Sequence, residues 1–500
     1  MKDQTEMLYR STRSALAPVT ASQAVLQGLA PDGGLYVPVS IPKLSIGPEQ
    51  LSAMNYRDTA YEVMRLFFTD FTEEELRDCI DGAYDSKFET AEPAVLKEAG
   101  GSYYLELFHG PTIAFKDMAL TILPRLMTTA AKKLGEKKEI VILTATSGDT
   151  GKAALSGFAD VPGTRIMVFY PKGGVSQIQE RQMVTQKGAN VGVAGVRGNF
   201  DDTQTGVKRI FTDAALREEL AEKGFQFSSA NSINIGRLVP QIVYYVYAYC
   251  QLLSSGEIAE GDFINITVPT GNFGNILAAY YAKLMGLPVR KLICASNKNK
   301  VLTDFFDTGL YDRKRPFMLT SSPSMDILIS SNLERLIYRL TGKDSGQTLA
   351  FMQDLTDKGS YTITDEMREG LGDFVGGCAS EEENFAGIKA LYERTGYVID
   401  THTGIANAVC RAYMEKTGDT TPTVIASTAS PFKFAEAVVG AIAPEKLEGK
   451  SDFELIDLLS DLSGTKEPFA ITDIRTAPVR HKTVVDAEDM PADVKQFLGI

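Results

Sequence analysis

Between residues 135 and 225 the chain alternates short apolar, β-branched runs with segments whose apolar residues recur at helical spacing. The first run, EIVILTAT at 139–146, is almost continuous, as expected of a parallel strand buried on both faces. The alternation of such strands with helices predicts a compact parallel α/β unit. The predicted strands are 139–146, 164–171 and 190–196, and the predicted helices are 152–159, 175–188 and 201–220.

A second series of the same kind begins near residue 230 with a strongly apolar helix, LVPQIVYYVYAYCQLL. The stretch from 300 to 400 is predicted to be mostly helical and irregular. The remaining elements of this series are predicted strands at 263–270, 289–296 and 421–430 and predicted helices at 276–286 and 432–442.

The first 95 residues mix a turn-rich stretch with helical patterns at 54–68 and 72–84. We therefore expect an α/β protein with two domains and mainly parallel sheets. The division is an N-terminal region at 1–95, a small domain at 135–225, and a large domain formed by 96–134 and 226–500. The last residues, VVDAEDMPADVKQFLGI, end in an apolar helix that is able to dock on the rest of the chain.

Composition and charge exclude several classes of protein. The 500 residues carry 51 Lys and Arg against 64 Asp and Glu, a net charge of −13, which disfavours a general nucleic-acid binder. No apolar run reaches the roughly 18 residues that a membrane span needs, and no secretory signal opens the chain. The five cysteines form no C-x-x-C pair, which favours a reducing cytoplasm. With three histidines, a multi-His metal site is not expected.

The segment HGPTIAFKD at 109–117 places Lys116 immediately before a helical run. A lysine among Ala114, Phe115 and apolar helix neighbours is partly desolvated, which lowers the pKa of the amine and makes it nucleophilic. Such a lysine suits Schiff-base chemistry. The pattern alone favours the alternative, a surface lysine at a helix start, because most lysines in such surroundings are structural.

The loop SGDTG at 147–151 lies between the predicted strand 139–146 and a helix. Unpaired N–H groups and the helix dipole favour an anion there, either a phosphate or a substrate carboxylate. The loop does not match a Walker A motif, because Thr146 replaces the required glycine and Ala153 the Ser or Thr. The alternative is an ordinary tight turn in which Asp149 caps the helix.

The loop GNFGN at 271–275 has the same placement between a strand and a helix. Gly271 and Gly274 allow a ligand to approach the backbone closely, although the third glycine of a dinucleotide motif is absent. Two such loops favour a phosphorylated cofactor in a crevice between domains. Arg237 in SINIGR and Lys433 in STASPFKF are candidate anion partners, with solvated charges at helix ends as the alternative.

Taken together, these segments resemble the threonine synthases, pyridoxal-phosphate enzymes of the tryptophan-synthase-β fold type. The resemblance spans about residues 8 to 440, and its ordered motifs are more specific together than any one alone. They are YRSTRSALAPVTASQAVLQGLAPDGGLYVP, HGPTIAFKDMA, TSGDTG, SINIGRLVPQIVYY, VPTGNFGN and ASTASPFKF.

The resemblance implies a pyridoxal-phosphate-dependent fold of type II and a role for each motif. Lys116 is the implied cofactor lysine and the catalytic base. The implied cofactor contacts are Phe115, Gly271, Asn272, Phe273, Gly274, Asn275 and Thr428, the last facing the pyridine nitrogen. The implied substrate contacts are Ser147, Gly148, Asp149 and Thr150 for the carboxylate, and Asn234, Arg237 and Lys433 for the phosphate.

The reaction implied by the resemblance converts O-phospho-L-homoserine and water into L-threonine and phosphate, the last step of threonine biosynthesis. The chain is then a cytoplasmic monomer or homodimer that binds this small molecule, with no nucleic-acid or membrane partner. The alternatives are a phospholyase that releases phosphate without threonine, and a serine/threonine dehydratase. A ligand-binding protein without activity, or a nucleotide-dependent enzyme, fits the sequence less well.

Overall fold

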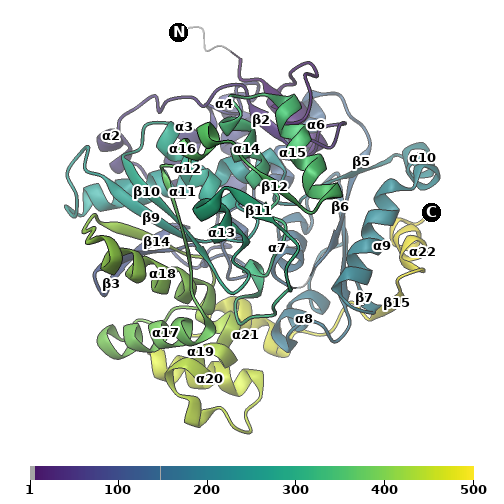
Figure 1. Cartoon of the computed structure of the whole chain (residues 1–500). Helices are drawn as coiled ribbons and strands as arrows, with labels where there is room; N and C mark the ends of the chain where they lie inside the picture. The colour runs from purple at the N-terminus through teal and green to yellow at the C-terminus, as the bar shows by residue number, and fades with distance from the viewer. Residues whose placement is uncertain (1–5, 147) are drawn as a thin grey trace.

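The computed structural model of the chain describes residues 6–146 and 148–500. Two mainly parallel sheets organise it (Figure 1). The larger sheet has the order β13-β10-β9-β14-β4-β3, and only its edge strand β3 runs antiparallel to its neighbour. Its strands are β3 (Val95–Ala99), β4 (Ser102–Glu106), β9 (Ile264–Pro269), β10 (Val289–Ser296), β13 (Phe374–Cys378) and β14 (Thr423–Ser427).

The smaller sheet has the order β15-β7-β6-β5-β8 and is parallel throughout. It forms the lobe at the right of Figure 1. Its strands are β5 (Glu139–Ala145), β6 (Thr164–Pro171), β7 (Val191–Arg197), β8 (Phe225–Ser228) and β15 (Thr483–Asp486). Two antiparallel pairs complete the sheets, β1 (Tyr9–Ser11) with β2 (Tyr36–Pro38) and β11 (Leu310–Asp312) with β12 (Ser360–Thr362).

Helices cover the sheets and fill the N-terminal region. Up to β9 they are α1 (Ala21–Gln27), α2 (Pro48–Ser52), α3 (Tyr56–Met64), α4 (Glu73–Ala83), α5 (Asp117–Leu120), α6 (Leu123–Lys133), α7 (Asp149–Phe158), α8 (Gln177–Val184), α9 (Phe200–Thr212), α10 (Ala214–Glu222) and α11 (Ile235–Ser254). After β9 they are α12 (Gly274–Leu284), α13 (Val301–Thr308), η1 (Pro323–Met325), α14 (Leu333–Leu340), α15 (Ser345–Asp357), α16 (Asp365–Glu369), α17 (Glu381–Thr395), α18 (Thr401–Thr417), η2 (Pro431–Phe434), α19 (Ala435–Ile442), η3 (Pro444–Lys446), α20 (Asp452–Ser463), α21 (Phe469–Thr476) and α22 (Met490–Leu498).

The fold class predicted from the sequence is confirmed, and the predicted strands lie close to the observed ones. The apolar runs at 164–171 and 289–296 form β6 and β10 without a change of bounds. The single helix predicted at 201–220 is wrong, because α9 and α10 are separate helices. The chain turns at Asp213, which has an extended backbone and caps α10 by accepting a hydrogen bond from Leu216 N.

Helix α11 is the centre of the larger lobe, as its composition predicts. It is apolar on all sides, and almost all of its residues are buried, which is the pattern of a helix with no solvent-facing side. Its sixth residue, Pro240, lies close enough to the start that few backbone hydrogen bonds are lost. The helix packs against α2, α3 and α12.

The end of the chain returns to the smaller sheet. Strand β15 pairs in parallel with β7, and α22 packs behind it, so that Met490 lies against Gly206 of α9 and Phe497 against Gly192 of β7. The sequence analysis assigned 226–500 to the large domain. We propose a division in which β15 and α22 belong with the small domain, because both bury their apolar side chains there.

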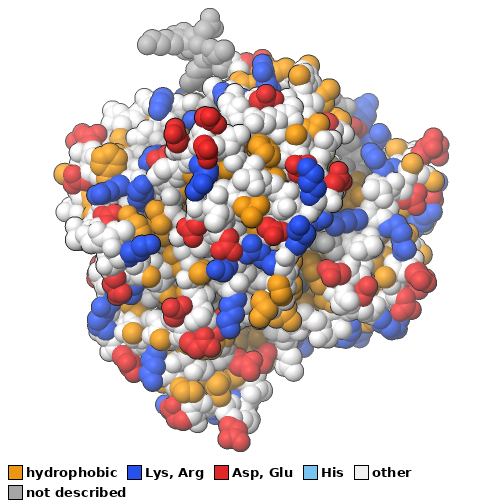
Figure 2. All heavy atoms as spheres, in the orientation of Figure 1, with side chains coloured by type: hydrophobic (Ala, Val, Ile, Leu, Met, Phe, Trp, Pro, Cys, Tyr) orange, Lys and Arg blue, Asp and Glu red, His pale blue; other side chains and the backbone are white. Residues whose placement is uncertain are grey.

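The surface carries charges of both signs. Figure 2 shows acidic and basic side chains interspersed over the face in view, rather than gathered by sign. Within residues 6–146 and 148–500, no helix combines the length and apolar character that crossing a bilayer requires. In the same part of the chain, no cluster of three or more His, Cys, Asp or Glu side chains is arranged to hold a metal ion.

Candidate active site

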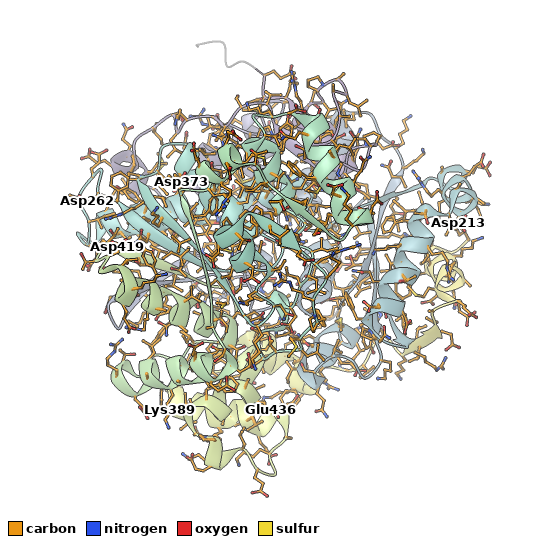
Figure 3. The ribbon with its side chains drawn as sticks, viewed as in Figure 1. Asp213, Asp262, Asp373, Lys389, Asp419 and Glu436 are labelled. Atoms are coloured by element: carbon orange, nitrogen blue, oxygen red, sulfur yellow. The ribbon has the colours of Figure 1, made fainter. Side chains whose placement is uncertain are left out.

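The candidate site lies at the carboxyl ends of the parallel strands, where loops after several strands meet. Asp262, Asp373 and Asp419 precede β9, β13 and β14, and they lie at one margin of the molecule (Figure 3). The opposite ends of these strands therefore point towards the middle of the molecule. The segments that follow β9, β14 and β5 there contain the loops singled out from the sequence.

The segment before Lys116 is fixed to the end of β14. Phe115 N donates to Thr428 O at 2.8 Å, and Ser430 N donates to Ile113 O at 3.0 Å. Ile113 has a positive φ of 52°, an uncommon backbone conformation for a β-branched residue, at the turn that aims the following side chains inwards. Lys116 is buried with 9% exposure, so it is not a surface lysine at a helix start.

The amine of Lys116 faces one carboxylate and a second buried amine. Its Nζ lies 3.8 Å from Asp149 Oδ2, while Lys433 Nζ lies 3.1 Å from Asp149 Oδ1. Burial lowers the pKa of Lys116 to about 8, against the opposing effect of Asp149. Burial by itself raises the pKa of Asp149, but the charges of Lys433 and Lys116 hold it well below its usual value.

The loop at 147–151 approaches this group from the smaller lobe. Ser147 lies outside the described residues. Gly148 has a φ of 143°, a conformation that favours glycine, and it precedes α7 without a side-chain cap. Thr146 Oγ1 instead accepts from Gly148 N at 2.9 Å and Gly151 N at 3.0 Å. Asp149 therefore does not cap the helix, and its carboxylate is turned to the lysines.

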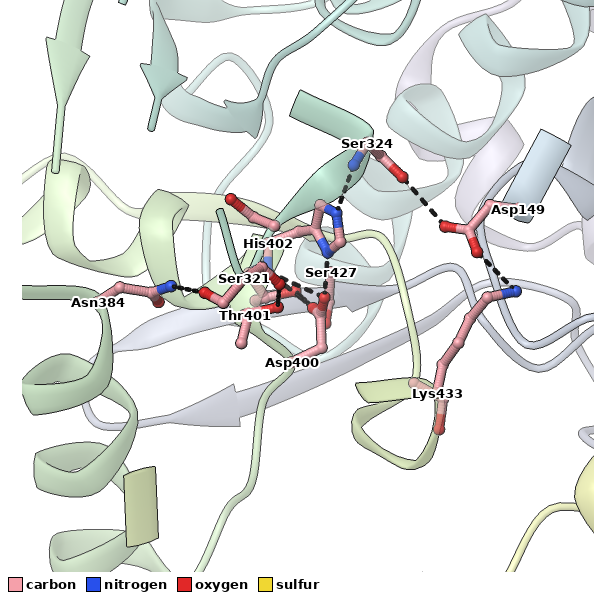
Figure 4. A network of polar contacts seen from close by, with 12 residues as sticks. Asp149, Ser321, Ser324, Asn384, Asp400, Thr401, His402, Ser427 and Lys433 are labelled. Atoms are coloured by element: carbon pink, nitrogen blue, oxygen red, sulfur yellow. Dashed lines mark hydrogen bonds and ion pairs between the residues drawn. The ribbon is translucent and has the colours of Figure 1, made fainter. Parts of the chain in front are cut away.

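Three residues that the sequence analysis did not assign complete the network (Figure 4). Ser324 Oγ donates to Asp149 Oδ2 at 3.0 Å, and Ser324 N donates to His402 Nε2 at 3.1 Å. The other ring nitrogen of His402 lies 2.7 Å from Asp400 Oδ2. Asp400 is the N-cap of α18 and accepts hydrogen bonds from His402 N and Thr403 N. The N-capping aspartate in the sequence DTHT is therefore the local signal that could have located His402. No local motif marks Ser324.

The loop at 271–275 leads into α12 with its first N–H groups free of side-chain caps. Phe273 has a left-handed backbone with a φ of 63° and precedes the helix, and no side chain caps it. A Cβ on Gly271 would lie 2.5 Å from Ser324 O, so this glycine permits the close approach of two backbone segments. Among the residues that the structure describes, buried Asn275 Nδ2 has no hydrogen-bond partner. A helix N-terminus with unpaired donors fits the phosphate group of a cofactor.

The other predicted cofactor contacts border Lys116. The Phe115 ring centroid lies 4.9 Å from Lys116 Nζ, and Thr428 is buried directly after β14. Asn272 lies opposite the start of α14, because its carbonyl accepts hydrogen bonds from Asn332 N at 3.1 Å and Asn332 Nδ2 at 3.0 Å. The buried amine, the flanking ring and the uncapped helix together fit an aldehyde cofactor that carries a phosphate.

The predicted phosphate contacts come from two elements, Asn234 and Arg237 from the start of α11 and Lys433 from η2. Arg237 is buried in α11, and one of its terminal nitrogens donates to Ala230 O at 3.0 Å. Its buried Nε has no hydrogen-bond partner within residues 6–146 and 148–500, and burial lowers the pKa of the guanidinium to about 10. Asn234 is occupied structurally, since it caps α11 by accepting from Gly236 N at 2.9 Å and donates to Val25 O at 3.0 Å.

Three family models match the chain in order. The model described as "Threonine synthase N terminus" matches residues 8–84, and "Threonine synthase, C-terminal" matches residues 403–485. Between them, "Pyridoxal-phosphate dependent enzyme" matches residues 92–428, which is more than half of the chain and contains Lys116 and both loops.

Named relatives agree with these models. Threonine synthase-like 1 of Homo sapiens is 41% identical over 447 residues, 87% of this chain and 59% of that protein, so the chain spans less than two thirds of its length. Threonine synthase of Saccharomyces cerevisiae is 38% identical over 467 residues, 87% of this chain and 89% of that protein. The crystal structure of PLP-bound threonine synthase from Brucella melitensis has a TM-score of 0.86 at 35% identity, covering 98% of this chain and 99% of that chain.

Proposed function

The chain belongs to the threonine synthase family of pyridoxal-phosphate-dependent enzymes, and we propose that it converts O-phospho-L-homoserine and water into L-threonine and phosphate. The observation that carries the proposal is the buried amine of Lys116, which lies beside Asp149 and 3.4 Å from the hydroxyl of Ser324. The carbonyl of Ser324 in turn packs against Gly271, in the loop that leads into the uncapped start of α12. The resemblance stated from the sequence motifs agrees with this family membership.

Lys116 is proposed to hold the cofactor and to move protons at the substrate. When bound, pyridoxal phosphate withdraws electrons from the substrate Cα and so makes its proton removable. With a pKa lowered by burial to about 8, a larger fraction of Lys116 is neutral near neutral pH than of an ordinary lysine, which suits a base. After Lys116 takes the Cα proton, the carboxylate of Asp149 stabilises its positive charge.

We propose that the loop at 271–275 binds the cofactor phosphate through the N–H groups at the start of α12. Phe115 and Asn272 would flank the ring of the bound cofactor, and Thr428 would face its nitrogen. Because a hydroxyl, unlike a carboxylate, does not enforce a protonated ring, Thr428 moderates the electron withdrawal and limits side reactions. The fold-type-II classification expected from the sequence belongs to the same proposal.

The charges around the site favour a substrate with two anionic groups. Lys116 and Lys433 both face the buried carboxylate of Asp149, and the charge of Arg237 also acts on Lys116. Three positive groups thus stand against the two carboxylates that act on Lys116, Asp149 and Asp117. Backbone groups of Gly148 and Thr150 are proposed to bind the substrate carboxylate, and Arg237 and Lys433 its phosphate, with Asn234 holding the start of α11. This excess of positive charge favours a phosphorylated substrate over the unphosphorylated substrate of a dehydratase.

The test is to incubate the purified, cofactor-loaded protein with O-phospho-L-homoserine and to quantify threonine and inorganic phosphate together. We expect equal molar release of both. Phosphate with a keto acid and ammonia would instead identify a phospholyase. In parallel incubations with serine or threonine, turnover of these substrates alone would identify a dehydratase. Release of neither phosphate nor threonine would overturn the proposal. The cytoplasmic location and the monomeric or homodimeric state stay predictions.

A further inference from the structure

Ser324 lies between the cofactor loop and the amine of Lys116. It belongs to η1, a single turn in the long connection between β11 and α14. Its carbonyl is so close to Gly271 that a Cβ on that glycine would lie 2.5 Å away. The position of Ser324 is therefore tied to the backbone of the loop that is proposed to bind the cofactor phosphate.

The hydroxyl of Ser324 connects the two charged groups of the site. Lys116 Nζ donates to Ser324 Oγ at 3.4 Å, and Ser324 Oγ donates to Asp149 Oδ2 at 3.0 Å. The amine and the carboxylate are 3.8 Å apart, too far for a direct hydrogen bond. The hydroxyl thus accepts a hydrogen bond from the Lys116 amine while it donates one to the Asp149 carboxylate.

The backbone of Ser324 is held by His402, which forms a buried pair with Asp400. His402 Nε2 accepts from Ser324 N at 3.1 Å, which places the ring proton on Nδ1, facing Asp400 Oδ2 at 2.7 Å. Asp400 is fully buried and also accepts from Thr403 N at 3.0 Å. The ring of Phe434 packs on His402 with centroids 4.8 Å apart. Ser324 therefore has a fixed backbone and a fixed direction for its hydroxyl.

We propose that Ser324 is a positioning residue for Lys116, held by the Asp400–His402 pair, and that its hydroxyl aims the Lys116 amine and couples it to Asp149. This inference rests on the proposed role of Lys116 as the cofactor lysine and base. No covalent bond forms or breaks at Ser324. When Lys116 is protonated, the hydroxyl accepts a hydrogen bond from the ammonium group. Because the same hydroxyl donates to Asp149, the negative charge of the carboxylate stabilises the ammonium group through it.

The decisive measurement uses the full-length chain without cofactor. Pyridoxal phosphate is added over a range of pH, bound amine is trapped with cyanoborohydride, and the modification of Lys116 is quantified by peptide mass spectrometry. The rate follows the neutral fraction of Lys116, whose charge also responds to Asp149, Lys433, Arg237 and Asp117. Because Ser324→Ala removes an acceptor of the protonated amine, we expect the midpoint pH to fall by about half a unit to one unit.

Two further variants separate positioning from damage to the fold. Ser324→Thr keeps the hydroxyl and is expected to retain the midpoint pH of the unsubstituted protein. Ser321→Ala is the matched control, because Ser321 lies in the same connection but its hydroxyl accepts only from Asn384 Nδ2 at 3.4 Å. In the cofactor-loaded enzyme, Ser324→Ala is expected to lower kcat by about 10- to 100-fold with little change in KM.

An unchanged or raised midpoint pH in Ser324→Ala, or the same fall in Ser321→Ala, would overturn the positioning role. This outcome is distinguishable from failure of the proposed function. A protein that makes no threonine but shows the shifted midpoint would retain the role of Ser324 and lose the reaction. A protein that makes threonine but shows no shift would retain the reaction and lose the role of Ser324.

Discussion

The Nζ of Lys433 lies 3.1 Å from Oδ1 of Asp149, and the two side chains are 0% and 7% exposed. This ion pair joins η2, which follows the last strand of the larger sheet, to α7 of the smaller lobe. The same carboxylate accepts from Gln179 Nε2 at 3.0 Å, so that three elements meet on one side chain. An anionic substrate that binds Lys433 has to compete with Asp149 for it.

Removal of Lys433 is expected to destabilise the fold, because it leaves the Asp149 carboxylate buried without this partner. We expect Lys433→Met to lower the free energy of unfolding by about 3–5 kcal/mol in urea titrations. Combining it with Asp149→Asn is expected to recover part of the loss. Lys187→Met is the control, since the Lys187–Asp473 pair is exposed and worth about 1 kcal/mol or less. Equal losses in Lys433→Met and Lys187→Met would contradict this account.

Removal of the Lys116 amine is expected to stop the reaction without unfolding the chain. We expect Lys116→Ala to reduce threonine release by about 10²- to 10⁴-fold or more, since it removes the group that moves the Cα proton. Thermal melting and circular dichroism check the fold. Lys137→Ala, at an exposed position after α6, is the control and is expected to keep full activity. A near-normal rate in Lys116→Ala would refute the assignment.

Neutralisation of Asp149 is expected to move the pH dependence of Lys116. Burial lowers the pKa of the Lys116 amine and the Asp149 carboxylate raises it, and the pKa that results is about 8. Asp149→Asn therefore lowers this pKa, and the amine becomes reactive at lower pH. The pH profile of pyridoxal-phosphate capture at Lys116 is the measurement. A profile that stays in place or moves to higher pH would show that Asp149 does not act on the amine.

A methyl group on the cofactor loop is expected to loosen cofactor binding. In Gly271→Ala the new Cβ lies 2.5 Å from Ser324 O, so the loop or η1 has to shift. We expect a loss of about 1–3 kcal/mol in unfolding free energy, together with faster loss of cofactor absorbance on dialysis. Gly346→Ala is the control, because its Cβ meets only Asp344 Oδ1 at 3.3 Å. Unchanged cofactor retention in Gly271→Ala would argue against the proposed loop function.

The C-terminal helix is expected to stabilise the smaller lobe. Met490 is fully buried against Gly206, so Met490→Ala is expected to cost about 2–5 kcal/mol of unfolding free energy. Met318, which is 43% exposed, provides the control, with an expected change within about 0.5 kcal/mol for Met318→Ala. Denaturant titrations of both variants test the difference, and similar midpoints would contradict the packing role of α22.

The sequence predicts elements well where burial leaves a continuous apolar pattern, as in β6 and β10. It does not predict β13, whose residues FVGGC are half-buried and include two glycines. Those glycines are explained only by packing, since a Cβ on Gly376 would lie 3.1 Å from Thr303 Cα and one on Gly377 2.4 Å from Val409 Cγ1. Likewise β15 is short and half-buried, and it pairs with a strand far away in the chain.

The residues of the candidate site also fall into those that the sequence predicts and those that it does not. The two loops are predicted because each lies in a local strand, loop and helix pattern, and Lys116 is predicted because it lies among apolar residues immediately before a helical run. Ser324 comes from a connection without such a pattern and His402 from the first turn of α18, and only the folded chain brings them to Asp149. The sequence analysis assigns Asp149 to the substrate carboxylate and does not predict its ion pair with Lys433, because Lys433 follows a strand of the other sheet.

The pairing of β15 with β7 has a consequence for how the protein is made. The smaller sheet acquires its outer strand β15 from a segment that is synthesised long after β7, so the N–H and C=O groups of β7 on that side lack this strand partner until β15 has left the ribosome. An uncovered edge in a nascent chain invites pairing with another molecule. A chain truncated before residue 483 would therefore keep the edge of β7 unpaired and prone to association. A chaperone that shields this edge during translation would act on β7 first.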